Sequence, residues 1–225
     1  HWQQKQAAKA VADAETSRRP VIDWEREPLP RPSFLGLKTV SPIPLQEVRS
    51  LINPVFFHRF WKVKKDSPEA RELWAEAEAL MDELQERHFL QAQVAFRRAF
   101  SSGDAIVFLP ENGEGECVEI PTPRRASSTS SVEAQGPALC DFVAPEGKED
   151  HVGLFAITLS PSFVEEIEAA RLGGDDFRHL LLRSVADRLV EAGSEWPPRE
   201  VRRTLWGYAP DENLTREAPA RAALR

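Results

Sequence analysis

This chain has few cysteines, no net positive charge and no long apolar run. Each of these features excludes a class of protein. The two cysteines, Cys117 and Cys140, can build neither a disulfide framework nor a four-ligand zinc site. No run approaches the ~20 consecutive apolar residues of a membrane-spanning helix, and no signal peptide opens the chain. We therefore expect a soluble, cytoplasmic protein with reduced thiols and no membrane contact.

The charge balance argues against nucleic acid as a partner. Lys and Arg number 29 against 36 Asp and Glu, so the net charge is −7, and an acidic surface repels polyanions. The five histidines are too far apart in sequence for two of them to share one helical turn, so no metal site is predicted. The sequence also shows no recognisable set of nucleophile, base and orienting group.

Proline and apolar content divide the chain into two parts. Residues 1–20 are rich in Ala, Gln and Lys, and we expect them to form a connector or linker helix. Four prolines between Pro20 and Pro32 then indicate extended, loop-like backbone. Hydrophobic residues make up 41% of the chain, which is ample for a core. We expect one domain over residues 21–225.

Helical periodicity appears in four segments. Ser67 can cap a helix near 68–88 and Pro68 can occupy its first turn. A short helix is expected after Pro44, another after Ser160, and a longer one near 176–192. The helix near 68–88 has an apolar stripe made of Leu73, Ala77, Leu80, Met81 and Leu84.

Strands are predicted near 105–109, 117–120 and 152–159. The first two flank the Gly-rich stretch "PENGEG", which favours a hairpin, and the third is a nearly continuous apolar run typical of a buried strand. The stretch "ALCDFVAP" is a further strand candidate. Helices, strands and helices in this order predict an α+β fold with a largely antiparallel sheet.

Aromatic residues gather in one short stretch. Phe56, Phe57, Phe60 and Trp61 are assigned to the core, and His58 among them is interpreted as a structural histidine. Trp206 and Tyr208 near the end of the chain are assigned to the core or its rim.

Six stretches of the chain, in order, resemble the C-terminal activation domain of cobalamin-dependent methionine synthase. The most specific are "DFVAP", "ADRLVEA" and "WGYAPDEN", and the matches run from Val21 to about Leu214. The resemblance implies a helmet-like α+β fold with a largely antiparallel twisted sheet and flanking helices. It implies S-adenosylmethionine as ligand, a cobalamin-binding domain as partner and a flavodoxin-type reductant. In methionine biosynthesis, such a domain supports the reductive methylation of cob(II)alamin.

The family's binding residues carry over in part. Glu191 matches an acidic contact to the ligand, whereas Asn53 stands where the family has another acidic residue. Asp187 matches a position that faces the cobalamin domain, so the resemblance makes it the docking residue. The family's Arg-Pro-Ala-Pro-Gly-Tyr-Pro run after "WGYAPDEN" is absent, and we expect a domain that is shortened at its C-terminal end.

Three functions stay open at this point. The chain could be a module of methionine synthase that supports reactivation with S-adenosylmethionine and is not catalytic alone. It could instead be a docking module that binds a cobalamin protein and has lost its ligand. A free-standing enzyme of other chemistry is the third. Ligand titration separates the first two, and co-purification with a cobalamin protein separates both from the third.

Overall fold

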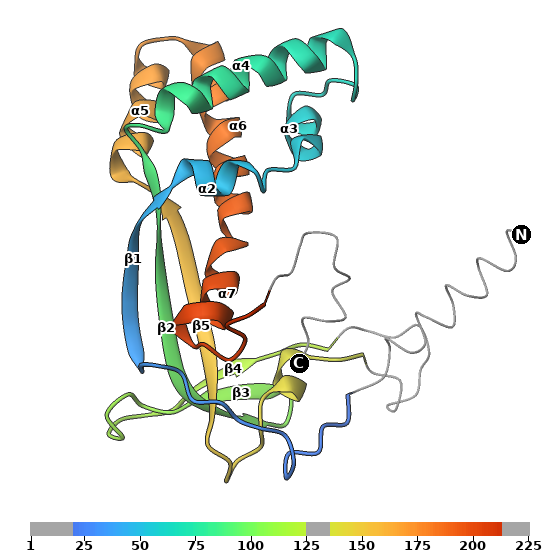
Figure 1. Ribbon diagram of the computed structural model, residues 1–225, viewed down its shortest axis with the longest axis vertical. Helices are drawn as coiled ribbons and strands as arrows, with labels where there is room; N and C mark the ends of the chain where they lie inside the picture. The colour runs from blue at the N-terminus through green and yellow to red at the C-terminus, as the bar shows by residue number, and fades with distance from the viewer. Residues whose placement is uncertain (1–19, 125–135, 213–225) are drawn as a thin grey trace, which may run out of the picture. The chain divides into compact units, whose positions relative to one another are not determined.

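The computed structural model describes residues 20–124 and 136–212, which form two compact units (Figure 1). The strand unit comprises residues 20–36, 96–124 and 136–153. The helical unit comprises residues 37–95 and 154–212. The predicted connector over residues 1–20 lies, apart from its last residue, outside the described residues.

Five strands form one sheet with the order β1-β2-β3-β4, in which β5 also pairs with β2. The predicted hairpin is confirmed, because β3 and β4 pair antiparallel with Phe108 opposite Val118. Strand β3 also pairs antiparallel with β2. The predicted α+β class with an antiparallel sheet is thus confirmed. The strands are β1 (Gly36–Pro44), β2 (Phe89–Ser102), β3 (Ala105–Phe108), β4 (Val118–Pro121) and β5 (Asp150–Leu159).

Helix α6 is the centre of the helical unit, where it contacts α2, α3, α4, α5 and α7 (Figure 1). Its buried face, with Leu182, Val185 and Leu189, joins a core that also contains Phe57 and Phe163. The helices are α2 (Leu45–Arg49), α3 (Pro54–Phe60), α4 (Pro68–Leu84), α5 (Pro161–Leu172), α6 (Asp176–Gly193) and α7 (Trp196–Glu200), followed by a π-helical turn (Val201–Leu205).

The last turn of α6 packs closely because it contains Gly193. A Cβ atom at this position would stand 2.9 Å from Leu90 Cδ1 on β2 and 3.0 Å from Ile157 Cδ1 on β5. Both distances are shorter than ordinary van der Waals contact, so a larger residue at this position would require the ends of these two side chains to shift.

Helix α4 follows the sequence prediction closely. Ser67 caps it by accepting a hydrogen bond from the backbone N–H of Ala70, and Pro68 begins the helix. Within the expected stripe, Ala77, Leu80, Met81 and Leu84 are buried and Leu73 packs against the core. These signals are local, which explains why the sequence predicted them well.

Two strand predictions were wrong. The stretch "ALCDFVAP" does not form a strand: residues Leu139–Phe142 form a 3-10 turn, in which the Asp141 carboxylate accepts a hydrogen bond from the backbone N–H of Ala138. Strand β5 was predicted to be buried, yet Leu154 and Phe155 are 43% and 45% exposed. An apolar run therefore indicated the strand but not its burial.

The strand unit has its own small core and one buried ion pair. Ile106, Phe108 and Cys140 belong to the core. Beside it, the Arg124 guanidinium donates two hydrogen bonds to the Asp141 carboxylate, at 2.6 and 2.8 Å. The two side chains are only 7% and 1% exposed. These hydrogen bonds hold the pKa of Arg124 above its ordinary value, so the guanidinium stays charged.

We predict that His58 contributes packing rather than hydrogen bonds. Its ring lies 6.1 Å from those of both Phe57 and Trp74, and its two ring nitrogens are buried with no hydrogen-bond partner among the described residues. Unpaired buried polar atoms destabilise a fold. His58→Leu should therefore lower the free energy of unfolding by no more than about 1 kcal/mol, or should raise it. His58→Ala should lower it by about 2 kcal/mol or more through a cavity. Urea denaturation measures both, and a large loss in His58→Leu would contradict the interpretation.

Candidate functional site

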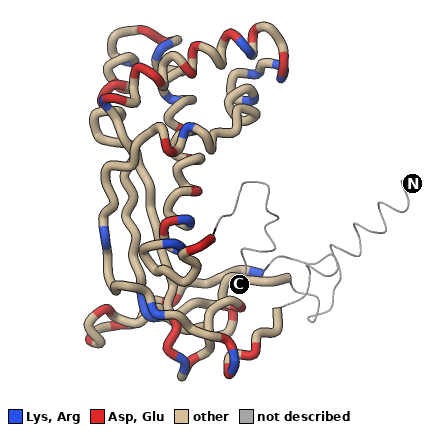
Figure 2. The backbone as a smooth tube through the Cα atoms, viewed as in Figure 1, with Lys and Arg blue, Asp and Glu red and all other residues tan. Residues whose placement is uncertain are grey.

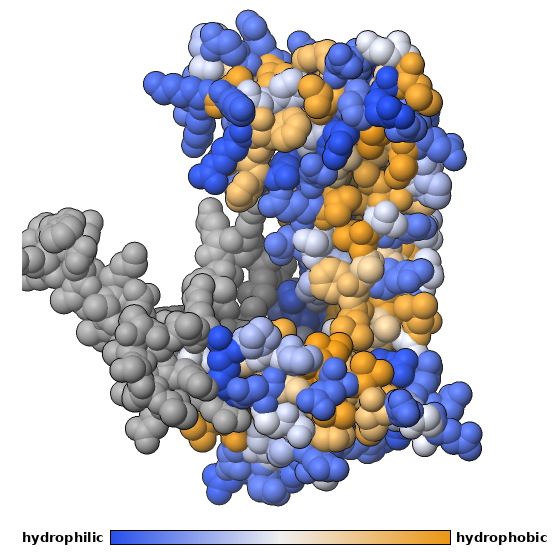
Figure 3. Space-filling view, turned by 180° about the vertical axis from the view of Figure 1, so that it is seen from behind, coloured by the Kyte–Doolittle hydropathy of each residue, from blue (hydrophilic) through white to orange (hydrophobic). Residues whose placement is uncertain are grey.

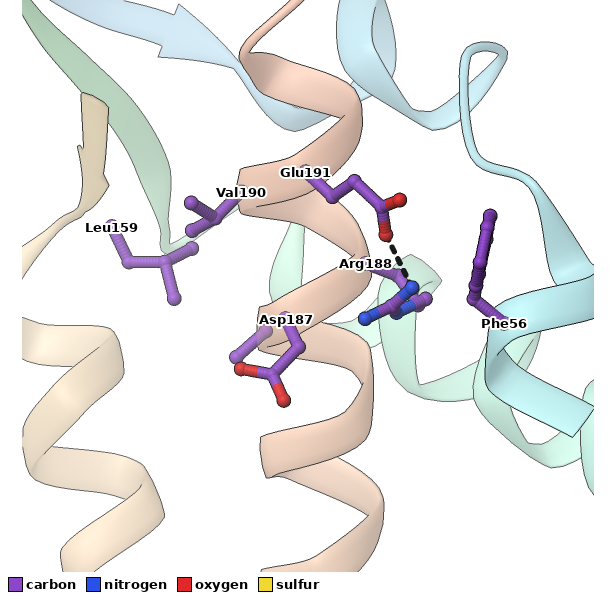
Figure 4. A pocket seen from close by; sticks show the side chains of 7 residues that line it. Phe56, Leu159, Asp187, Arg188, Val190 and Glu191 are labelled. Carbon is purple, nitrogen blue, oxygen red and sulfur yellow. Dashed lines mark hydrogen bonds and ion pairs between the residues drawn. The ribbon is translucent and has the colours of Figure 1, made fainter. Parts of the chain in front are cut away.

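A pocket of about 530 Å³ opens beside the middle of α6, in the helical unit (Figure 4). Two acidic side chains and one basic side chain of the same helix line it, together with apolar residues from α3, β5 and α6. The lining residues are Phe56, Leu159, Ala186, Asp187, Arg188, Val190 and Glu191.

Helical spacing brings the acidic residues together. Asp187 and Glu191 are one turn apart on α6 and therefore lie on the same side of the helix. Asp187 is exposed and has no ion-pair or hydrogen-bond partner among the described residues. The structure thus brings two of the three predicted site residues, Asp187 and Glu191, into one pocket.

Arg188 already forms an ion pair with Glu191. One guanidinium N–H of Arg188 donates to the Glu191 carboxylate, and the guanidinium carbon lies 5.6 Å from the centre of the Phe56 ring (Figure 4). The Glu191 side chain remains 50% exposed. The sequence analysis did not single out Arg188, although its i,i+3 spacing to Glu191 was a usable signal.

Asn53, the third predicted site residue, does not line the pocket. It caps α3, because its side-chain oxygen accepts a hydrogen bond from the backbone N–H of Val55 at 3.1 Å. Asn and Asp cap helices about equally well, so an acidic residue here would take the same local partner.

The assignment of all four clustered aromatics to the core was wrong. Phe57 is fully buried and Trp61 packs against the core, but Phe56 and Phe60 are 41% and 49% exposed. Helix α3 is only seven residues long. Positions four apart share a face of a helix, so Phe57 and Trp61 point inward while Phe56 and Phe60 point outward. This arrangement is what places the Phe56 ring at the pocket.

One hydrogen bond fixes α3 against α6. The indole N–H of Trp61 donates to the hydroxyl of Ser184 at 3.1 Å, and Ser184 donates to the backbone carbonyl of Leu181. Both partners are thereby satisfied in an otherwise apolar contact.

The helical unit exposes apolar surface as well. Its parts of β1, β2 and β5 carry one charged residue, Lys38, whereas charges of both signs are spread over α4 and α5 (Figure 2). Seen from behind, hydrophobic side chains gather over these strands (Figure 3). Among them, Leu37 is 65% exposed. Exposed apolar surface of this kind is typical of contact with another protein or domain.

Residues 206–212, which the structure describes of the "WGYAPDEN" stretch, form a turn held by an ion pair. Arg202 Nε donates to both carboxylate oxygens of Glu212, at 2.9 and 2.7 Å, and Gly207 adopts a φ of 81° that favours glycine. Trp206 is half-buried and Tyr208 is 44% exposed, and their rings lie 5.9 Å apart. Partial burial raises the pKa of the Tyr208 phenol. Residues 213–225, which follow the turn, lie outside the described residues.

The described part of the chain shows neither a metal-binding cluster nor a helix that could span a membrane. Residues 20–124 and 136–212 contain no group of three or more His, Cys, Asp or Glu side chains that could hold a metal ion. Every helix within these ranges is too short or too polar to cross a membrane.

Comparison with known proteins agrees with the resemblance. The family model described as the activation domain of vitamin B12-dependent methionine synthase matches residues 44–223. Among solved structures, the crystal structure of the MetH reactivation domain bound to AdoHcy is similar, with a TM-score of 0.75 and 26% identity. That match covers 94% of this chain and 69% of the other.

Proposed function

Because this chain belongs to the family of vitamin B12-dependent methionine synthase activation domains, we propose that it supports the reactivation of a methionine synthase. It would do so by docking onto the cobalamin-binding domain, where S-adenosylmethionine supplies a methyl group to the reduced cobalt and a flavodoxin-type protein supplies the electron. The observation that carries the proposal is the pocket on α6, in which Asp187 and Glu191 lie beside Phe56.

The chemistry of the pocket fits part of an S-adenosyl ligand. Such a ligand has an ammonium, a carboxylate, an adenine ring and, in S-adenosylmethionine, a sulfonium cation. The Glu191 carboxylate can accept hydrogen bonds from the ammonium, and the Phe56 ring offers an aromatic face to a cation or to adenine. A volume of about 530 Å³ is also in the range of small-molecule sites. The solved relative holds AdoHcy.

Two features weaken this fit. Arg188 already neutralises Glu191 and takes one of its two carboxylate oxygens, which weakens the attraction of Glu191 for an ammonium. Asn53 is uncharged, and its side-chain oxygen caps α3. The exchange of one half-exposed ion pair for another gains only about 0–1 kcal/mol. We therefore propose that the described residues alone bind S-adenosyl ligands weakly.

Titration calorimetry of the full chain with S-adenosylmethionine or S-adenosylhomocysteine tests this directly. We expect no saturation at micromolar ligand. Asn53→Asp should recover little affinity, because the new carboxylate would still cap α3. Saturable binding at micromolar ligand that Glu191→Gln abolishes would contradict weak binding. It would favour reactivation with bound ligand over the alternative.

The alternative is a docking module that binds the cobalamin protein without an S-adenosyl ligand. The Arg188–Glu191 ion pair favours this alternative, since Arg188 neutralises the carboxylate that would otherwise attract the ligand's ammonium. The two functions predict the same contact with the cobalamin domain and differ in the titration. Measurements of docking and of ligand binding therefore distinguish them.

A further inference from the structure

A serine, a histidine and a glutamate form one hydrogen-bonded chain in the helical unit, and none of the three lines the pocket on α6. Ser162 Oγ lies 3.0 Å from His88 Nδ1, and His88 Nε2 lies 2.9 Å from Glu166 Oε2. Ser162 and Glu166 are one turn apart on α5, while His88 immediately precedes β2. Ser162 lies 74 positions after His88 in the chain, so no local sequence pattern indicates this set.

The glutamate determines which nitrogen of His88 carries the proton. Arg178 and Arg87 each donate a hydrogen bond to Glu166, at 2.9 and 3.1 Å. Burial would raise the pKa of Glu166, but the hydrogen bonds from His88 and Arg178 hold it below its ordinary value. Glu166 is therefore a carboxylate that can only accept. The Nε2 atom of His88 must donate to it, which leaves Nδ1 to accept the proton of a hydroxyl.

Two serine hydroxyls lie near His88, but only one of them is accessible to a solute. Ser160 Oγ is also near, 3.5 Å from His88 Nδ1 and 3.2 Å from Ser162 Oγ, but Ser160 is only 1% exposed. Ser162 is exposed, so a solute can reach it. It is the second residue of α5, and its own backbone N–H can donate to a developing oxyanion because it has no intrahelical carbonyl. The next two N–H groups, of Phe163 and Val164, already donate to the carbonyl of Ser160.

We propose that Ser162 is an activated nucleophile that accepts an acyl group from small esters, with His88 as general base and Glu166 as its positioning residue. Ser162 Oγ forms a bond to the ester carbonyl carbon while its proton passes to His88 Nδ1. The bond to the alcohol oxygen then breaks, and His88 returns the proton to that oxygen. Water then gives a proton to His88 Nδ1 and forms a bond to the acyl carbon. The bond from that carbon to Ser162 Oγ breaks, His88 returns the proton to Oγ, and the carboxylic acid leaves.

The test uses the full chain and 4-nitrophenyl acetate. Release of 4-nitrophenol should be faster than in buffer, and peptide mass spectrometry should find one acetyl group on Ser162. Ser162→Ala should remove that acetyl group and lower the protein-dependent rate by about 100-fold. Ser160→Ala is the matched control and should keep both. If Ser162→Ala reacts like the parent chain, or if Ser162 carries no acetyl group, the proposal is wrong and the set only joins α5 to β2.

A second pair of variants separates chemistry from structure. His88→Gln should lower the rate by about 100-fold, whether or not its unfolding temperature changes. Glu166→Gln should move the acid limb of the pH–rate profile to lower pH, because the protonated ring loses its carboxylate partner while Arg87 and Arg178 remain. An unmoved profile in a folded Glu166→Gln chain would contradict the positioning role.

Discussion

Asp187→Lys is expected to weaken binding of the chain to the cobalamin-binding domain by about 100-fold or more, which corresponds to a cost of several kcal/mol for a reversed charge at an interface. Asp187 is exposed and unpaired among the described residues, so the substitution breaks no internal contact. Surface plasmon resonance with the cobalamin-binding domain of the same methionine synthase measures the change.

Glu165→Lys is the matched control for this experiment. Glu165 is an exposed, unpaired acid on α5, within the same unit but outside the pocket. Its reversal changes the net charge equally, and we expect it to change affinity far less, since only the general attraction between the molecules is altered. Equal binding by the Asp187→Lys and parent chains would mean that the docking face lies elsewhere.

Arg124→Met is expected to lower the free energy of unfolding by about 3–5 kcal/mol, because it leaves the Asp141 carboxylate buried without its cation. Urea denaturation checks this. Asp104→Asn removes another partner of Arg124, but the Asp104 side chain is 59% exposed, so we expect a loss of about 0–1 kcal/mol. If both variants were equally stable, the buried pair would not be a main support of the strand unit.

The sheet was predicted less completely than the helices, for two reasons. In β2, Leu90, Ala92, Val94 and Phe96 alternate with more polar residues and are all fully buried. That period of two is typical of a half-buried strand, yet no strand was predicted for this stretch. Strand β1 contains Pro42 and Pro44, which argue against a strand. It forms because it stands at the end of the strand order, where an edge strand tolerates proline.

The candidate site was predicted only as far as its residues follow local rules. Asp187 and Glu191 share a helix, so their proximity follows from spacing once α6 is recognised. The capping role of Asn53, the contact of Arg188 with Phe56, and the approach of His88 to Ser162 depend on elements that fold together from distant segments. Such contacts leave no periodic signal in the chain.

Gly193 has a consequence for how this family can change over evolutionary time. The methyl group of an alanine would meet Leu90 and Ile157, and Leu90 is fully buried and has little room to move. A side chain at position 193 therefore requires that the ends of Leu90 and Ile157 shift or that one of these residues becomes smaller. We expect larger residues at position 193 to occur together with smaller residues at position 90 or 157.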